Sequence, residues 1–423
     1  MPAPDIGNLR PILIFQPRFR SFFMDLLSLQ VRLGVLLSCL WQMCGGVAIG
    51  QEPIAELIFP LHPQHNHAPG IAELQNGELI ASWYRGSGER TADDVAVWGA
   101  RLKPGSTAWS ESFLLADTPG FPDCNTALMT DAEGRLFLFW PVIIANTWET
   151  CLTRLRVSDH PAGTGAPAWN RDETILLKPD DFSAEAIRVL DQTLALLPAL
   201  PPQKMASINE ARERLSQKVW QRLGWQPRCK PTVLSSGRIL LPLYTDTFSL
   251  SIMAISDDGG RTWFAGKPLL GFGAIQPTVL QRSDGTVVAW MRENGFTGHV
   301  RYAESSDEGV TWGPVLVSGL PNPGSGVDGV RLQSGRWLLV HNDAAEGRGR
   351  LAVSLSDDEG RTWKWKRLLE DLAEGSAHYP CVIQTRDGRI HVVYSYFVKE
   401  GKSMKHTVFT EAWLESVPAA GKQ

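Results

Sequence analysis

The chain has 423 residues, and its 41 basic and 45 acidic side chains leave it close to neutral. This balance argues against a nucleic acid or another polyanion as the main partner, because such partners favour a clear excess of basic residues. The length exceeds one ordinary domain but fits a single closed repeat architecture, which would also account for the 16 tryptophans.

The first 50 residues predict an export signal. Residues 1–32 carry arginines and few acidic side chains, and residues 33–50 form an apolar, nearly uncharged run that ends in the small residues Ala48-Ile49-Gly50. The run is short for a membrane span, whereas small residues at its end are typical of a signal-peptide cleavage site. We therefore expect export to the periplasm or the extracellular space, with a mature chain that begins near Gln51 and has no membrane span.

Two alternatives concern the same region. Met24 opens a more ordinary signal peptide than Met1 does, so a start at Met24 is a second option. Cys39 lies in a Leu-Ser-Cys segment of the apolar run, which makes a lipid-anchored lipoprotein the alternative to a released product.

From Gln51 onward the chain repeats one local pattern six times: an apolar strand, a turn with glycine, and a second apolar strand. Each repeat predicts a β-hairpin. The turn glycines are Gly77, Gly134, Gly237, Gly285, Gly335 and Gly388, and the tryptophans that follow them are Trp109, Trp169, Trp263, Trp312, Trp363 and Trp413. Six such units predict an all-β fold, a six-bladed β-propeller over residues 51–423. Residues 54–60 would close the ring as the outer strand of the last blade.

Three units also contain a polar box, at residues 256–263, 305–312 and 356–363. In each box an Asp/Gly turn precedes Thr-Trp, so that a tight turn places a tryptophan against the sheet. We assign Asp257, Asp307 and Asp357 to turn formation rather than to catalysis. The boxes, of the form S-x-D-x-G-x-T-W, resemble the Asp boxes of sialidases and their BNR-repeat relatives, over roughly residues 57–413. This resemblance implies a sialidase-like propeller, but non-catalytic propellers carry such boxes too.

An insertion separates the second and third hairpins. Apolar residues recur at helical spacing over residues 182–224, and prolines near position 200 interrupt them. This pattern predicts two helices joined by a proline-rich turn. We expect the helical insertion to narrow the opening of the ring and to bring Glu210, Arg212 or Arg214 near a bound sugar. The alternative is a peripheral cover over a blade edge.

Four cysteines follow the signal region, and their spacings match no zinc pattern: Cys124, Cys151, Cys229 and Cys381. Export permits a disulfide, but buried free thiols fit the sequence as well, so no pairing is predicted. The sequence contains no evident metal-ligand set, and we expect no cofactor.

Propeller topology predicts which residues share a face. The innermost strands begin, and the second strands end, on one face of the ring, whereas the Asp boxes lie on the opposite face. The first face collects polar residues from many blades: His67, Arg85, Lys230, Asp246, Gln276, Arg292, Asp328, Asn342 and Tyr379. A concave polar site near the ring axis is therefore expected, although polar residues also line the water-filled channel of any propeller.

The resemblance to sialidases implies roles for particular residues. Tyr379 matches the place of the family's nucleophilic tyrosine, and Arg292 and Arg350 match two of the three arginines that hold the sialic-acid carboxylate. Guanidinium groups suit that task because they offer carboxylates paired donors and stay charged. The loop of residues 86–94 matches the position of the general acid, for which Glu89, Asp93 and Asp94 are the candidates.

Two departures from the family pattern affect the chemistry. The first clamp arginine has no counterpart, because His67 stands at the matching strand start. The glutamate that takes the proton from the tyrosine is replaced by Gln276, and an amide is not a base. Another acid, such as Glu210, Asp246 or Asp328, would have to act, or the chemistry differs from that of a standard sialidase.

Three functions fit the sequence. The first is a secreted sialidase-like glycoside hydrolase that acts on a terminal acidic sugar through Tyr379. The second is a polysaccharide lyase that acts on a uronate, with Tyr379 or His67 as base and acid. The third is a carbohydrate-binding propeller without catalysis. All three have an acidic glycan as partner, and their reaction products distinguish them.

Overall fold

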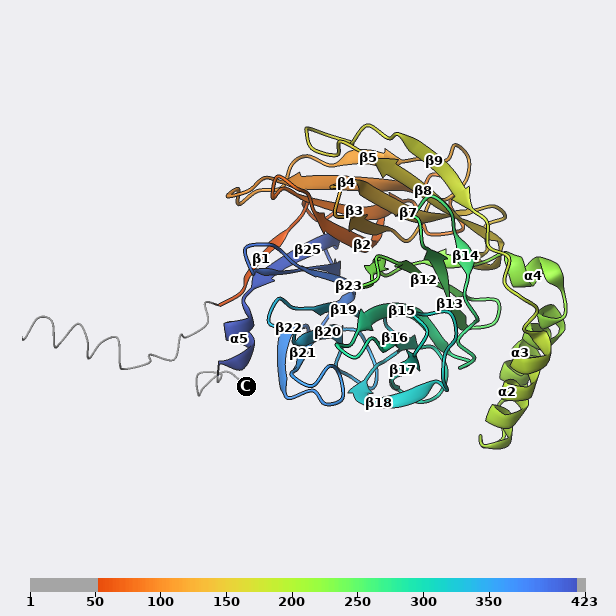
Figure 1. The fold of residues 1–423 in the computed structure, drawn as a ribbon. Helices are drawn as coiled ribbons and strands as arrows, with labels where there is room; N and C mark the ends of the chain where they lie inside the picture. The colour runs from red at the N-terminus through yellow and green to blue at the C-terminus, as the bar shows by residue number, and fades with distance from the viewer. Residues whose placement is uncertain (1–51, 417–423) are drawn as a thin grey trace, which may run out of the picture. The chain divides into compact units, whose positions relative to one another are not determined.

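The computed structural model describes residues 52–416. They form six antiparallel sheets, which follow one another along the chain as the blades of a propeller (Figure 1). Blade 1 contains β2 (His65–Glu73), β3 (Leu79–Gly86), β4 (Ala96–Leu102) and β5 (Phe113–Ala116). Blade 2 contains β6 (Ala127–Thr130), β7 (Leu136–Ile143), β8 (Cys151–Ser158) and β9 (Arg171–Ile175). A short 3-10 helix, η1 (Trp148–Thr150), precedes β8.

The third and fourth blades follow the insertion. Blade 3 contains β10 (Gln226–Pro227), β11 (Thr232–Val233), β12 (Ile239–Thr245), β13 (Leu250–Ser256) and β14 (Phe264–Ala265), with β10 and β11 both paired to β12. Blade 4 contains β15 (Ala274–Gln281), β16 (Val287–Glu293), β17 (His299–Ser305) and β18 (Leu316–Pro321).

The last two blades complete the ring. Blade 5 contains β19 (Asp328–Arg331), β20 (Trp337–Asn342), β21 (Arg350–Ser356) and β22 (Trp365–Asp371). Blade 6 contains β23 (Ser376–Gln384), β24 (Ile390–Val398) and β25 (Gly401–Phe409), followed by helix α5 (Glu411–Glu415). Its outer strand is β1 (Ile54–Leu57), which pairs with β25 from Ile54 opposite Val408 to Leu57 opposite Lys405. The predicted closure of the ring by an N-terminal strand is thus confirmed, and β23 also contacts β2 of blade 1.

Six of the seven apolar clusters of the core lie between neighbouring blades, and the seventh contains Tyr379. Successive side chains of a strand point to opposite faces of its sheet, so each strand contributes to two clusters. On β16, Val287 and Ala289 pack toward blade 3, whereas Val288 and Trp290 pack toward blade 5. This two-sided burial explains why the central strands are continuous apolar runs.

The turn glycines and the boxes have the conformations that their sequences indicate. All six turn glycines are left-handed, with φ between 81° at Gly77 and 90° at Gly285. In each box the serine hydroxyl accepts the amide of the box glycine, as in the 2.8 Å contact between Gly360 N and Ser356 Oγ. The carboxylate that accepts from the box threonine belongs to Asp258, Asp307 and Asp358.

The turn assignment is therefore correct for Asp307 and shifted by one residue in the other two boxes. Asp257 instead pairs with Arg238, and Asp357 with Lys364. Each box glycine also lies against a side chain of the preceding blade. A Cβ on Gly260 would lie 2.8 Å from Phe137 of β7, and one on Gly360 would lie 2.9 Å from Trp290 of β16. The boxes therefore pack at the interfaces between neighbouring blades as well as forming turns.

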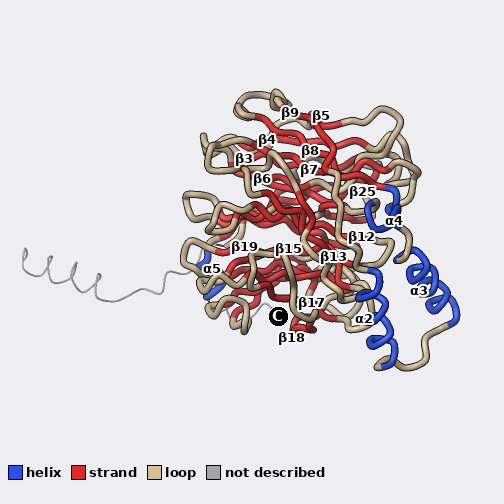
Figure 2. Tube along the Cα trace, turned by 45° about the vertical axis from the view of Figure 1, so that its right-hand side comes forward, coloured by secondary structure: helices blue, strands red, loops and turns tan. Residues whose placement is uncertain are grey.

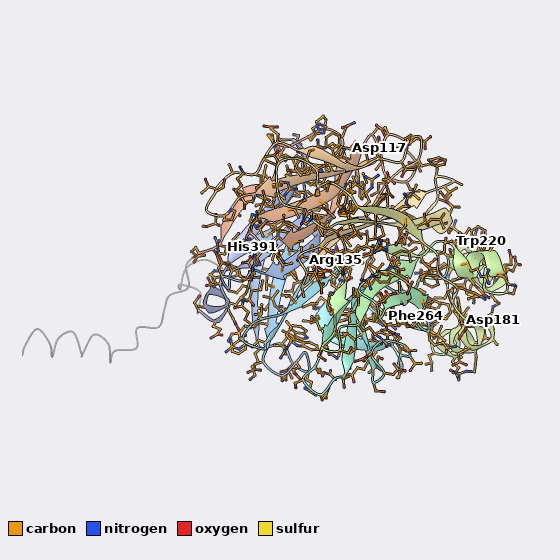
Figure 3. All side chains as sticks on the ribbon, turned by 45° about the horizontal axis from the view of Figure 1, so that its top comes forward. Asp117, Arg135, Asp181, Trp220, Phe264 and His391 are labelled. Atoms are coloured by element: carbon orange, nitrogen blue, oxygen red, sulfur yellow. The ribbon has the colours of Figure 1, made fainter. Side chains whose placement is uncertain are left out.

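The insertion between β9 and β10 folds as helices α2 (Ser183–Ala195), α3 (Pro202–Leu215) and the short α4 (Lys218–Arg222). Figure 2 shows them in blue at the edge of the strand-built ring, and Figure 3 places Trp220 and Asp181 there, across the ring from His391. Ala186 of α2 and Leu215 of α3 are buried in the cluster between blades 2 and 3. The helices are thus anchored in the core.

The structure also settles two smaller points for residues 52–416. The four cysteines there are buried free thiols, so no disulfide forms among them. No helix in this part of the chain is long and apolar enough to cross a membrane. The predicted signal region lies outside the described residues.

Candidate functional site

In three of the innermost strands, the pairing with the next strand is interrupted at the same position. The register shifts after His67, Ile275 and His378, and the next residue in each strand has a left-handed backbone with φ of 53° to 55°: Ala68, Gln276 and Tyr379. A left-handed conformation is a genuine outlier for a bulky side chain such as tyrosine and costs on the order of 1–3 kcal/mol. Strain of this kind points to a functional site, and here it turns Gln276 toward Tyr379.

The Tyr379 hydroxyl accepts two hydrogen bonds. Arg292 Nη1 donates to it at 2.6 Å, and Gln276 Nε2 donates at 3.1 Å. Arg292 is the second-to-last residue of β16, Gln276 lies in β15 and Tyr379 lies in β23, so three strands of two blades meet at one oxygen. Tyr379 is 8% exposed. Its aromatic ring is buried, whereas its hydroxyl lies within the polar face of the propeller.

Three guanidinium groups surround the Tyr379 ring. Their Cζ atoms lie 5.1 Å (Arg228), 5.7 Å (Arg348) and 5.8 Å (Arg292) from its centroid. Among residues 52–416, no carboxylate forms an ion pair with any of the three. Arg292 and Arg348 are only partly buried, and Arg348 donates to the Gly324 carbonyl at 2.6 Å. Cations that converge without a counter-ion are suited to bind an anion.

Arg228 differs from the other two arginines because it is buried and 4% exposed. It donates to the carbonyls of Val327 at 3.0 Å and Pro380 at 2.7 Å. It thereby ties blade 3 to blades 5 and 6 directly beneath the tyrosine. Arg228 supports the site from inside rather than facing a ligand.

The neutral imidazole rings of His67 and His378 also lie beside Tyr379. The His67 ring lies 4.3 Å from the Tyr379 ring, and its Nδ1 is 2.7 Å from the Ser395 hydroxyl. Burial holds the pKa of His67 well below its ordinary value, and repulsion between protonated His67 and His378 lowers it further. Burial and Arg348 lower the pKa of His378 to about 3. Both rings therefore stay uncharged at neutral pH and leave the positive charge to the arginines.

A hydrogen-bonded chain of polar side chains connects Tyr244 to Asp246. Asn125 Nδ2 donates to the Tyr244 hydroxyl at 3.1 Å and to Gln226 Oε1 at 3.3 Å, and Gln226 Nε2 donates to Asp246 at 3.0 Å. Gln276 Oε1 is buried without a partner. Burial raises the pKa of Asp246 to about 6, against the opposing charge of Arg292. Asp246 is therefore the carboxyl near the site that exchanges a proton close to neutral pH.

The three candidates for the general acid, all in the loop of residues 86–94, have different hydrogen-bond partners. Glu89 accepts from the Tyr84 hydroxyl at 2.8 Å and contacts His65 Nε2 at 3.1 Å, within the aromatic cluster that includes His67. Although burial opposes it, hydrogen bonds from His65 and Tyr84 lower the pKa of Glu89. Asp94 is bound by the amide and hydroxyl of Ser87, and Asp93 by Asn146, so both stabilise the loop itself.

The other predicted site residues do not reach Tyr379. Arg350 is exposed and contacts Asp371 at 3.5 Å; the arginine that approaches the tyrosine is Arg348, two positions earlier. The reason is that Arg350 is the first residue of β21, where its side chain leaves the outer side of the blade, whereas Arg348 is in the loop above the ring. Asn342 donates to the carbonyls of Arg348, Arg350 and Ala377, so it shapes this loop.

Lys230 and Asp328 neutralise each other across the channel, at 2.6 Å. Asp328 also accepts from Thr278 and from the Val382 amide, and Lys230 lines a cavity of about 660 Å³ that extends to the turn glycine Gly285. This pair thus faces the other end of the channel. Arg85 lies over the rings of Phe59 and Trp98 on the side of blade 1, away from the axis.

The sequence analysis did not single out four residues of the site: Arg228, Tyr244, Arg348 and His378. Arg228 precedes the strand start Cys229-Lys230-Pro231, and His378 precedes Tyr379, so both were adjacent to positions that the topology had selected. No group of three metal-ligating side chains occurs among the described residues.

The family model for a BNR repeat-like domain matches residues 210–392. A sialidase from Micromonospora viridifaciens is 28% identical over 179 residues, which cover 40% of this chain and 26% of the relative. An anhydrosialidase from Macrobdella decora is 24% identical over 198 residues, or 41% of this chain and 25% of the relative. The chain thus spans about a quarter of the length of these curated relatives.

Solved structures with the same fold cover most of the chain. A protein of unknown function from Dyadobacter fermentans superposes with a TM-score of 0.64 at 17% identity, over 86% of this chain and 99% of that one. The NanB sialidase from Streptococcus pneumoniae superposes with a TM-score of 0.63 at 14% identity, over 85% and 71%. At these identities the likeness concerns the fold.

Proposed function

Since this chain is a BNR-repeat propeller with the sialidase fold, we propose that it is a glycoside hydrolase that removes a terminal acidic sugar. The observation that carries the proposal is the convergence of three arginines without counter-ions on one strained tyrosine. Arg292 and Arg348 would hold the sugar carboxylate from two sides. Their planar donor sets match a carboxylate, which a lysine could not do equally well.

In this proposal Tyr379 is the nucleophile. Its oxygen attacks the anomeric carbon while the bond to the leaving oxygen breaks, and water later cleaves the tyrosyl intermediate. A neutral tyrosine suits an anionic sugar, since an attacking carboxylate would be repelled. The phenolic proton has to leave, and Gln276, which donates to the hydroxyl, is not a base. We take the neutral imidazole of His67, whose ring centroid lies 4.3 Å from that of Tyr379, as the acceptor.

The leaving oxygen needs a proton, and Asp246 is the better donor on chemical grounds. A carboxyl with a pKa of about 6 is partly protonated near that pH, whereas Glu89 has a lowered pKa and is ionised there. Glu89 remains the alternative if a bound substrate displaces His65.

One observation favours a second candidate, a lyase that acts on a uronate. Gln276 stands where a hydrolase of this kind needs a base, and an elimination does not need one at that position. As a phenolate, Tyr379 would remove the proton next to the carboxylate while the arginines neutralise the developing charge, and the resulting phenol would give that proton to the leaving oxygen as its bond to carbon breaks. The product would carry a double bond conjugated to the carboxylate.

A product screen on sialosides, uronides and acidic polysaccharides distinguishes the candidates. Hydrolysis releases a saturated reducing sugar, elimination releases an ultraviolet-absorbing one, and a binding protein releases nothing. Tyr379→Phe should lower turnover by about a hundredfold or more in either enzyme and leave binding nearly intact. Tyr302→Phe is the matched control, because Tyr302 stacks on Trp290 in blade 4, away from the site. Full activity in Tyr379→Phe would refute both mechanisms.

We also propose export, on the basis of residues 1–50. Cleavage next to Gly50 would leave β1, which begins at Ile54, intact. N-terminal sequencing of secreted protein tests the proposal, and a cytoplasmic product that retains residues 1–50 would contradict it.

A further inference from the structure

Two connected cavities lie between the insertion and the ring. The first, of about 210 Å³, is enclosed by α2 and α3 on one side and by the loops after β12 and β16 on the other. The second, of about 710 Å³, continues under α2 toward Trp312 of blade 4. Phe272, Phe296, Thr193 and Leu197 line both, so the two form one groove. We call it the insertion groove.

The inner end of the insertion groove is next to the candidate site. Asp246 lines the groove, and the charge of Arg292, which donates to the Tyr379 hydroxyl, acts on its carboxyl. Asn294 is on the groove wall as well, and its side-chain oxygen accepts from Arg292 Nη2 at 3.3 Å. A ligand bound by Arg292 can therefore extend past Asp246 into the groove.

The lining of the inner part is mainly apolar. Leu190, Leu194 and Ile208 come from the helices, and Phe248, Phe272 and Phe296 come from the ring. Phe296 is 46% exposed, although it is a large aromatic residue next to a polar site, and Lys204 Nζ of α3 lies 3.9 Å from its ring centroid. Sugar hydroxyls would lose hydrogen bonds to water against such a wall, whereas an alkyl or aryl group would gain by burial of its apolar surface.

We propose that the insertion groove binds an apolar aglycone, that is, an alkyl or aryl group attached to the acidic sugar. This inference rests on the proposed function, because it takes the sugar to be at Tyr379 and the leaving oxygen at Asp246. It assigns the helical insertion to substrate selection: the enzyme prefers glycosides of apolar alcohols, such as glycolipids or aryl glycosides, over the same sugar on an oligosaccharide.

Adjacent leucines provide a matched pair of variants. Leu197 lines both cavities, whereas Leu196 is 87% exposed and lines neither. Leu197→Ser and Phe296→Ala should weaken ligand binding in the groove, and Leu196→Ser should not. Neither Leu197 nor Phe296 contacts Tyr379 or an arginine of the site, and thermal unfolding of each variant checks that it folds.

The binding test needs no turnover. Calorimetry with the full chain would compare n-octyl, phenyl and methyl β-galactopyranoside below the micelle concentration of the octyl compound. We expect octyl and phenyl galactoside to bind at least about tenfold more tightly than methyl galactoside, and the gain to fall about fivefold or more in Leu197→Ser and Phe296→Ala. Tighter binding of octyl galactoside than of phenyl galactoside would indicate a lipid-like aglycone. Tighter binding of phenyl galactoside would indicate an aryl aglycone.

Equal binding of the three galactosides, or equal effects of Leu196→Ser and Leu197→Ser, would overturn the inference. So would competition by lactose as strong as that by octyl galactoside, which would assign the groove to sugars. A protein that binds octyl galactoside but releases no product from any acidic glycan would contradict the proposed hydrolase and still support the groove. If the product screen succeeds, kcat/KM for apolar and oligosaccharide glycosides of the same sugar should show the same preference.

Discussion

Arg228 lies beneath Tyr379 with its guanidinium carbon 5.1 Å from the ring centroid, and it donates to the carbonyl of Pro380, the residue that follows the tyrosine. A buried cation thus holds the strained backbone segment and contributes positive charge from below. Arg228 does not replace the clamp arginine that the sequence lacks, because its donors are used on the carbonyls of Val327 and Pro380.

Arg228→Met tests this role, because methionine retains much of the length but none of the donors. It leaves the carbonyls of Val327 and Pro380 without this partner, so the free energy of unfolding should fall by about 2–4 kcal/mol. Arg228→Lys should recover part of the stability but not both bonds. Thermal unfolding measures the loss, and a drop in kcat with unchanged KM would identify Arg228 as a positioning residue. Unchanged stability in Arg228→Met would contradict the assignment.

Gln276→Glu distinguishes hydrolase from lyase. A glutamate would place a base 3.1 Å from the Tyr379 hydroxyl, where the amide is a donor. A hydrolase should become faster, because the phenolic proton would have an acceptor. A lyase should gain nothing, because in the elimination the proton passes from Tyr379 to the leaving oxygen and no further acceptor is needed. Initial rates with both product assays are the measurement, and Gln276→Ala controls for loss of the amide alone.

Asp246→Asn should change activity in a pH-dependent manner. If Asp246 protonates the leaving oxygen, the wild-type rate falls as pH rises through about 6, and the variant loses about a hundredfold or more at pH 5 with no further fall of that kind. A wild-type rate that instead rises through pH 6 would make Asp246 a base.

The same variant should be more stable than the wild type above pH 6. The pKa of Asp246 is raised from 3.8 to about 6 in the folded protein, so the folded state holds the proton more tightly and loses stability as pH rises from about 4 to above 6. Asn removes that loss, a gain of about 1–3 kcal/mol at pH 7.5 and almost none at pH 4. Denaturant unfolding at the two pH values checks it, and a gain of equal size at pH 4 would be inconsistent with this origin.

Gly360→Ala should show that the boxes seal the seams between blades. Its φ is 83°, and a Cβ would lie 2.8 Å from Trp337 and 2.9 Å from Trp290. We expect a loss of about 2–4 kcal/mol, from backbone strain and overpacking together. Gly285→Ala is the control: its φ is 90° but a Cβ would meet nothing within 4 Å, so only about 1–2 kcal/mol of strain remains. Equal losses in thermal unfolding would rule out a packing role.

The propeller itself was predictable because local patterns repeat. Each hairpin turn has a left-handed φ that favours glycine, and the central strands of each blade are apolar on both faces. Six copies of this pattern identify the fold without knowledge of long-range contacts. The site was predictable only where a residue stands at a fixed place in a strand. Tyr379 and Gln276 stand at strand starts, and the topology brought them together.

Residues in loops and at the axis were harder to assign. Arg348 and Arg350 are two positions apart, and only the path of the loop decides which one turns toward the tyrosine. Arg228 joins residues about a hundred and a hundred and fifty positions away through their backbone carbonyls, and such carbonyls leave no trace in a sequence. The raised pKa of Asp246 likewise depends on burial by elements that are distant along the chain.

The pairing of β1 with β25 also has a consequence for the order of events during synthesis. The strand that completes the last blade is among the first parts of the propeller to be made, and it must wait for Gly401–Phe409 before it has a partner. Until then blade 1 has no neighbour on one side, and the unpaired strand is a template for pairing with other chains. The nascent chain therefore stays vulnerable to aggregation until β25 emerges, and truncations that remove β1 or β25 should harm solubility more than cuts in the loops between blades.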